Sequence, residues 1–140
     1  MSTTLALTDL ERETLDLIVR LNLTSLGENL RATADGMDEA IREAQVYADL
    51  LRAAESGELP LPLNPIAALR IESWRDALPR EIAYERNGLA KRRAGDPDYG
   101  WSDDLEADES QYAEHIENLE RELEGCDSIL NRAQAAPVPA

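Results

Sequence analysis

The chain has 140 residues, of which 29 are acidic and 14 basic, so its formal net charge is -15 at pH 7. Phosphate recognition requires clusters of Lys and Arg, and this balance therefore disfavours direct binding to nucleic acid or to an anionic membrane. Phe is absent and aromatic residues make up only 4%. Such a composition suits helix-to-helix packing better than a β-sandwich or an α/β core.

A short helix is expected near the N-terminus. Thr8 and Glu11 have the spacing of a capping box, in which each residue's side chain satisfies the backbone N–H of the other. Asp9 adds negative charge where the helix dipole favours it. Apolar residues then recur up to about Leu23, which gives the expected end of this helix.

A second and longer helix is predicted over residues 25–56. Ser25 and Glu28 again have capping-box spacing, and the apolar residues that follow alternate by four and three, which is a heptad seam. The seam residues are Leu30, Ala34, Met37, Ile41, Ala44, Ala48 and Leu51. Residues 57–63 contain two prolines, which fix extended backbone, and are expected to form a connector.

The third helical segment, over residues 65–94, contains a proline. Asn64 is expected to cap it, and Pro65 suits the first helical position because its missing N–H would have no partner there. An interior proline removes a donor and clashes one turn back, at a cost of about 3 kcal/mol. The third helix is therefore expected to be kinked or broken at Pro79.

The clearest pattern in the chain is the acidic segment over residues 102–135. Ser102 is expected to cap a long helix here. Its apolar residues fall on a second heptad seam, with Glu109 filling one step. They are Leu105, Tyr112, Ile116, Leu119, Leu123, Cys126 and Leu130. Acidic side chains crowd the remaining positions, so one face should pack while the other is strongly negative.

Together these segments predict an all-α fold. The three long helices have similar lengths and short connections, which is typical of an elongated antiparallel bundle, with the shorter N-terminal helix against one groove. We expect a single domain over residues 1–135 and a flexible C-terminal tail over residues 136–140. The sequence has neither a signal-peptide pattern nor an apolar run of membrane-spanning length, so a cytoplasmic location is expected.

Catalytic and metal-binding motifs do not match the sequence. His115 is the only histidine and Cys126 the only cysteine, so paired-histidine and cysteine metal sites are impossible. An EF-hand starting at Asp96 would place Gly100 and Ala107 at positions that require ligands. We therefore predict a non-enzymatic protein with no cofactor and no metal.

The acidic helix and the loop before it form the candidate partner-binding site. The eleven acids from Asp103 to Asp127 give one charge per roughly 3.4 Å of helix, close to the spacing along one DNA strand. Aromatic residues in the loop are either anchors for a partner or a plug for the end of the bundle. The predicted partner-binding residues are Tyr99, Trp101, Asp103, Asp104, Glu106, Asp108, Glu114, Glu117, Glu120 and Glu124.

Two functions remain open at this point, and the lack of a second histidine argues against a third, an enzyme or cofactor carrier built on a helical bundle. The first is an acidic protein-binding module, such as an inhibitor that occupies the basic nucleic-acid-binding surface of a target, as DNA-mimic proteins of phages and mobile elements do. The alternative is a structural or assembly module that self-associates through its heptad seams into a homo-oligomer. An acidic face that only keeps the protein in solution is an equally simple explanation of the charge. Five basic residues in the second half of the third helix are expected to pair with the acidic helix of the same molecule: Arg80, Arg86, Lys91, Arg92 and Arg93.

Overall fold

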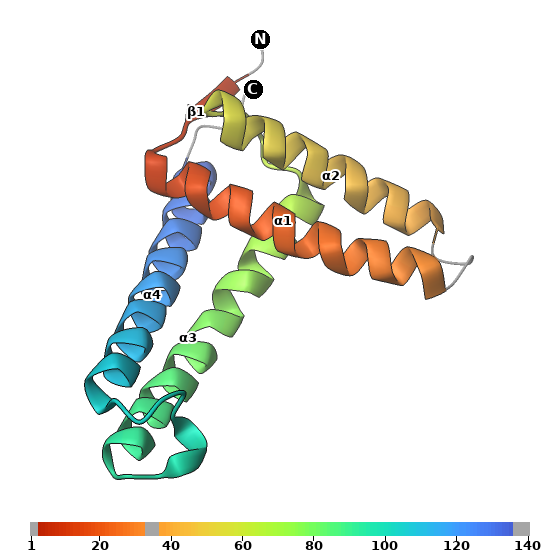
Figure 1. The fold of residues 1–140 in the computed structure, drawn as a ribbon. Helices are drawn as coiled ribbons and strands as arrows, with labels where there is room; N and C mark the ends of the chain where they lie inside the picture. The colour runs from red at the N-terminus through yellow and green to blue at the C-terminus, as the bar shows by residue number, and fades with distance from the viewer. Residues whose placement is uncertain (1–2, 33–36, 136–140) are drawn as a thin grey trace. The chain divides into compact units, whose positions relative to one another are not determined.

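The computed structural model describes residues 3–32 and 37–135, which form four long helices and a small two-stranded sheet (Figure 1). The elements in chain order are β1 (Thr3–Ala6), α1 (Asp9–Ala32), α2 (Met37–Ser56), β2 (Glu58–Leu61), α3 (Pro65–Arg93), the 3-10 turn η1 (Pro97–Tyr99) and α4 (Leu105–Ala135). The predicted helical class is confirmed, while the elongated antiparallel bundle stays a prediction. Within the described residues, no helix has the length and apolar character needed to cross a membrane.

The backbone contacts divide the chain into two compact units. The first unit comprises residues 1–74 and 125–140, and the second comprises residues 75–124. The division therefore falls within α3 and within α4. The expected single domain stays a prediction, and the expected tail, residues 136–140, lies outside the described residues.

The core of the first unit is built around α1 and α2, which lie side by side (Figure 1). Leu15, Ile18 and Val19 recur at helical spacing along one face of α1 and are fully buried. The buried residues of α2 are Val46, Tyr47, Leu50, Ala53 and Ala54. This is a different face from the predicted seam.

The predicted seam of α2 is therefore wrong where the structure describes it. Ile41 is 50% exposed, and Ala44, Ala48 and Leu51 are only half-buried. Alanine fits on more than one face of this helix, whereas burying larger side chains removes more apolar surface from water and so decides which face packs. Three other members of the seam lie outside the residues whose burial is described: Leu30, Ala34 and Met37.

The boundary predicted between the first two helices is also wrong. α1 continues through Ser25 and Glu28 to Ala32, and α2 begins at Met37. Serine followed three residues later by glutamate is compatible with a helix interior, and no glycine or proline ends the helix before Ser25. As a result α1, with 24 residues, is longer than α2, with 20.

The predicted connector after α2 contains a β-strand. β2 pairs antiparallel with β1, and Thr4 lies opposite Pro60 in the register. The N–H of Leu7 donates to the carbonyl of Gly57. Along an antiparallel strand, the backbone N–H and C=O groups of successive residues point alternately toward the partner strand and away from it. Pro60 therefore occupies a position that faces away from β1, where its missing N–H costs the ladder nothing.

The second unit is a hairpin of the last turns of α3 and the first turns of α4. α3 runs unbroken from Pro65 to Arg93 through the exposed Pro79, so the predicted break there is wrong, while a kink stays a prediction. Leu78 and Ile82 of α3 and Tyr112 and Leu119 of α4 are buried. The last two confirm the predicted seam of α4, as do Cys126 and Leu130 in the first unit, but Leu105 is 41% exposed.

Of the four predicted helix caps, two are confirmed, at Thr8 and Asn64, and the one at Ser25 is wrong because α1 continues through it. Thr8 Oγ1 accepts from the N–H of Glu11, whose Oε1 accepts from the N–H of Thr8 in return. Asn64 Oδ1 likewise accepts from the N–H of Ile66 at the start of α3. The cap predicted at Ser102 is wrong. Asp104 caps α4 instead, and its Oδ1 accepts from the N–H groups of Glu106 at 3.0 Å and Ala107 at 3.3 Å.

Candidate partner-binding surface of the second unit

Ion pairs hold the two helices of the second unit together. Arg86 pairs with Glu120, Arg92 Nε lies 2.7 Å from Asp108 Oδ2, and Arg93 Nε lies 3.0 Å from Glu109 Oε1. From Arg86 to Arg92 and Arg93 along α3, the partner moves back along α4 from Glu120 to Asp108 and Glu109, which is the pattern of an antiparallel pair. The prediction that these bases pair with the acidic helix is confirmed for these three arginines. Lys91 instead donates to Tyr99 Oη, at 3.1 Å, and Arg80 is exposed.

Asp108 is buried at the centre of these contacts, with 1% of its surface exposed. Its Oδ2 accepts from Arg92 Nε and from the N–H groups of Trp101, at 3.2 Å, and Ser102, at 3.4 Å. Its Oδ1 accepts from Ser102 Oγ at 3.0 Å. The hydrogen bond from Arg92, followed by those from Ser102 and Trp101, lowers the pKa of Asp108, although burial opposes this.

Asp108 is therefore an internal residue that fixes the loop before α4, and it does not belong to an exposed binding surface. The prediction from sequence treated it as one more carboxylate of the acidic face. Helical spacing could have predicted its burial, because Asp108 lies one turn before the buried Tyr112 and so on the same side of α4. Its partner Arg92 is 16 residues away, on another helix.

The two aromatic residues of the loop fold onto Tyr112. Tyr112 Oη donates to the carbonyl of Tyr99 at 2.9 Å, and the ring centroids of Trp101 and Tyr112 are 4.6 Å apart. The Lys91 ammonium lies 4.9 Å from the centre of the Tyr99 ring, within the range of a cation–π interaction. Tyr99 is half-buried, as expected of a plug, whereas Trp101 is 60% exposed and remains available to a partner.

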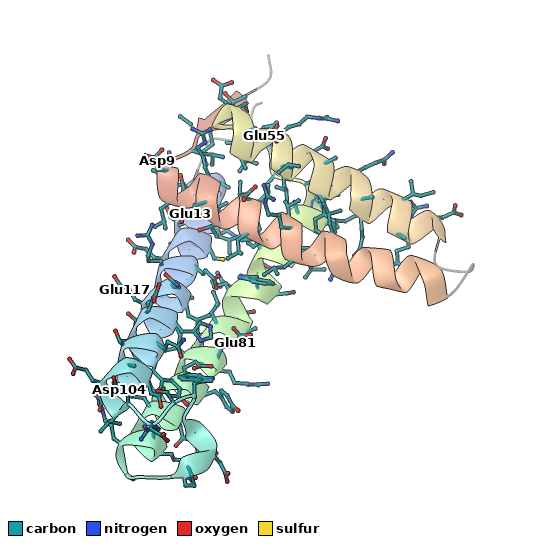
Figure 2. The ribbon with its side chains drawn as sticks, viewed as in Figure 1. Asp9, Glu13, Glu55, Glu81, Asp104 and Glu117 are labelled. Atoms are coloured by element: carbon teal, nitrogen blue, oxygen red, sulfur yellow. The ribbon has the colours of Figure 1, made fainter. Side chains whose placement is uncertain are left out.

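Five exposed glutamates follow the side of α4 that is turned away from its buried seam. This group, the acidic stripe, consists of Glu106, Glu114, Glu117, Glu120 and Glu124. At 100° per residue all five fall within about 120° of one another, roughly opposite Tyr112 and Leu119. Figure 2 shows Glu117 on the side of α4 away from α3.

The acidic stripe carries charge that the described part of the chain does not neutralise. Glu120 pairs with Arg86. Among the described residues, the other four carboxylates have no ion-pair partner. Two further predicted residues precede them: Asp103 is exposed, and Asp104 is exposed but caps the helix.

The acidic stripe is sparser than one strand of DNA. From Glu106 to Glu124 its five carboxylates extend over about 27 Å of helix, so there is one charge per roughly 6 Å. The expected match to a strand, at one charge per about 3.4 Å, counted carboxylates that are in fact buried, paired or off this face. The stripe therefore resembles a general anionic surface more closely than a copy of a phosphate backbone.

Other features of the described chain add little chemistry. Within residues 3–32 and 37–135, no three His, Cys, Asp or Glu side chains are grouped so that they could hold a metal ion. The first unit has a pocket of about 290 Å³ whose lining combines apolar side chains such as Val46, Leu50 and Leu59 with the charged Asp49, Arg52 and Glu58. No protein-family model, no curated protein and no solved structure matches the chain.

Proposed function

We propose that this protein is a non-catalytic binding module whose acidic stripe contacts a basic surface of another protein. The nucleic-acid-binding surface of a target is the first candidate for that surface. The observation that carries the proposal is the row of exposed carboxylates on α4, four of which have no ion-pair partner in the described part of the chain. Complementary charge of this kind steers association and fixes the register of a complex.

The distribution of arginines supports a role beyond solubility. Arg86, Arg92 and Arg93 all pair with carboxylates of α4. Only one of these carboxylates, that of Glu120, belongs to the acidic stripe, so most of the stripe remains charged. A net charge of magnitude about 2 to 8 is enough to keep a small domain in solution, and the chain carries -15. A rigid helix that presents part of this excess on one side suits a basic partner.

A charge-removal experiment tests the proposal. The immobilised chain is incubated with a cell lysate, and retained proteins are eluted with a salt gradient and identified by mass spectrometry. The stripe variant carries Glu106→Gln, Glu114→Gln, Glu117→Gln and Glu124→Gln. The control variant removes four exposed charges from the first unit, through Asp38→Asn, Glu39→Gln, Glu55→Gln and Glu58→Gln.

The expected result is a basic nucleic-acid-binding protein that DNA displaces, that the control variant retains and that the stripe variant releases at lower salt. Equal elution from both variants would contradict the proposal, because total charge and not the stripe would then be responsible. Self-association through the helices is the alternative. Recovery of only the protein itself, unaffected by salt, would favour it, with contacts expected from exposed apolar residues such as Leu21, Ile41 and Leu69.

A further inference from the structure

A second feature of the second unit combines aromatic rings with negative charge. A pocket of about 200 Å³ lies where the loop before α4 meets α3, and it is lined by Tyr84, Glu85, Asp98, Tyr99, Trp101 and Tyr112. Four of the six aromatic residues in the chain thus line one small pocket. Pockets for drug-sized ligands usually measure about 300 to 1,000 Å³, so this one suits a single side chain.

The walls of the pocket are arranged by contacts already described. Trp101 packs on Tyr112, which is only 6% exposed and forms the inner wall. Tyr112 of α4 packs against α3 at Gly88, where a Cβ would lie 3.1 Å from the tyrosine ring and hydroxyl. A larger residue at position 88 would crowd this contact. Tyr84 and Trp101 are 69% and 60% exposed, so their rings are open to a partner, and Tyr and Trp are residue types enriched at interfaces.

The charge of the pocket is negative. Glu85 and Asp98 both line it, and the Glu85 side chain is 17% exposed and therefore partly withdrawn from water. Burial raises the pKa of the Tyr112 hydroxyl, and the charge of Glu85 adds to this shift. His115 Nδ1 lies 3.4 Å from Glu85 Oε2, and the His115 side chain is 55% exposed.

We propose that this pocket receives an arginine side chain of the partner protein. A guanidinium group is planar and weakly hydrated, so it stacks on aromatic faces, and its five N–H donors match carboxylate acceptors. The pocket supplies both kinds of surface, in the exposed rings and in the two carboxylates. The Tyr99 ring already lies against the Lys91 ammonium, so the exposed rings of Tyr84 and Trp101 are the faces offered to a further cation. That the arginine belongs to a protein rests on the function proposed above.

Arginine is a better fit than the other organic cations. A lysine ammonium is a compact and strongly hydrated charge that gains less from flat aromatic walls. A quaternary ammonium group has no N–H donor and could not form hydrogen bonds to either carboxylate. The combination of rings with Glu85 and Asp98 therefore favours a guanidinium.

The test uses the full chain and small probes, so it needs no partner. N-acetyl-arginine amide is titrated into the ¹⁵N-labelled protein, and the NMR signals of the Trp101 indole and of the backbone amides at the pocket are followed. The indole of Trp74, which does not line the pocket, is the internal control. N-acetyl-citrulline amide has nearly the same shape without the charge, and N-acetyl-lysine amide and tetramethylammonium are the competing cations.

The arginine probe is expected to give saturable shifts confined to the pocket, with the citrulline probe about tenfold weaker because the cation–π and charge-assisted contacts are lost. Glu85→Gln should weaken arginine binding about tenfold and Tyr84→Ala about threefold. Glu81→Gln, which removes an exposed charge one turn away on α3, should leave it unchanged. Citrulline binding as tight as arginine, tighter binding of lysine or tetramethylammonium, or no effect of Glu85→Gln would overturn the proposal.

The two proposals can fail separately. The acidic stripe lies on the opposite side of α4 from Tyr112, so its glutamine variant should bind the arginine probe like the unchanged chain. Arginine binding in a protein that retains no basic partner would support the pocket and contradict the proposed function. Salt-sensitive capture through the stripe without any arginine binding would overturn the pocket alone.

Discussion

At the scale of single residues, Gly125 marks a close helix contact in the first unit. A Cβ at this position would lie 1.9 Å from Thr14 Oγ1 and 2.9 Å from Thr14 Cβ, and Thr14 is itself buried, with its hydroxyl donating to the carbonyl of Leu10. Alanine normally stabilises a helix interior by about 1 kcal/mol relative to glycine. Here Gly125→Ala should instead lower the free energy of unfolding by about 1 to 3 kcal/mol, because the added methyl overpacks the contact. Urea unfolding followed by circular dichroism measures the change.

The double variant with Thr14→Ala provides the control. Removing the Thr14 hydroxyl and methyl relieves the closest contact but leaves its Cβ in place, so part of the lost stability should return. If the double variant lost as much stability as the two single variants together, the two residues would not be in contact as the structure indicates.

Asp108 gives a prediction that depends on pH. Its pKa is lowered in the folded protein from the usual 3.8, so its charge stabilises the folded state above that value and loses this effect as the pH falls through the lowered pKa. Asp108→Asn should therefore unfold at a lower temperature than the unchanged chain at neutral pH, and the difference should shrink below about pH 4. Thermal unfolding measured across this range tests the prediction.

Asp103→Asn is the matched control for this effect, because it removes one exposed carboxylate from the loop that Asp108 fixes. It should leave the unfolding temperature nearly unchanged. A difference for Asp108→Asn that stayed constant down to low pH would mean that the lost interaction does not depend on the carboxylate charge.

Sequence reasoning located caps better than it located buried charges. The capping box of Thr8 and Glu11 follows from local spacing and was predicted. The burial of Glu11, whose side chain also accepts from Ser128 Oγ and pairs with Arg132, depends on residues more than 100 positions away. Asp108 differs from Glu11, because its position on the buried side of α4 follows from helical spacing, and only its pairing with Arg92 depends on another helix.

At the scale of secondary-structure elements, the cap of α4 is the feature most open to test. Asp104 accepts two backbone N–H groups at the helix start, and loss of such a cap costs about 1 kcal/mol. Asp104→Ala should lower stability by about that amount. Asp103→Ala removes an adjacent charge without this cap and should cost clearly less. Equal losses in urea unfolding would mean that charge at the N-terminus of α4 matters more than the cap itself.

Heptad spacing predicted the buried face of α4 but not that of α2, and composition explains the difference. Along α4 acidic residues occupy most of the other positions, so only one face is apolar enough to pack. Along α2 alanines occur on several faces, and the larger Val46, Tyr47 and Leu50 select one of them. The short strand β2 was missed because Pro60 argues against a strand unless its missing donor faces away from the neighbouring strand.

At the scale of the whole molecule, the charge is shared more evenly than the sequence suggested. The last third of the chain appeared to dominate, with 13 acidic and two basic residues from position 96 onward. Folding places the basic part of α3 beside this segment, so the second unit has 15 acidic and seven basic residues, and the first unit has 14 and seven. Both units are therefore strongly negative, and mutual repulsion of charges should lower the stability of the whole chain.

Salt should consequently stabilise the protein. The exposed ion pairs between α3 and α4 are each worth only about 0 to 1 kcal/mol, whereas repulsion acts among all the unpaired carboxylates. As sodium chloride rises from about 0.05 to 0.5 M, the screening length falls well below 10 Å and repulsion weakens, so the unfolding temperature should increase. The stripe variant with four glutamines should unfold at a higher temperature in low salt and respond less to added salt. A decrease of the unfolding temperature with salt would show that the ion pairs outweigh the repulsion. The excess negative charge would then not lower the stability of the folded protein, and stability would give no reason to expect a binding role for it.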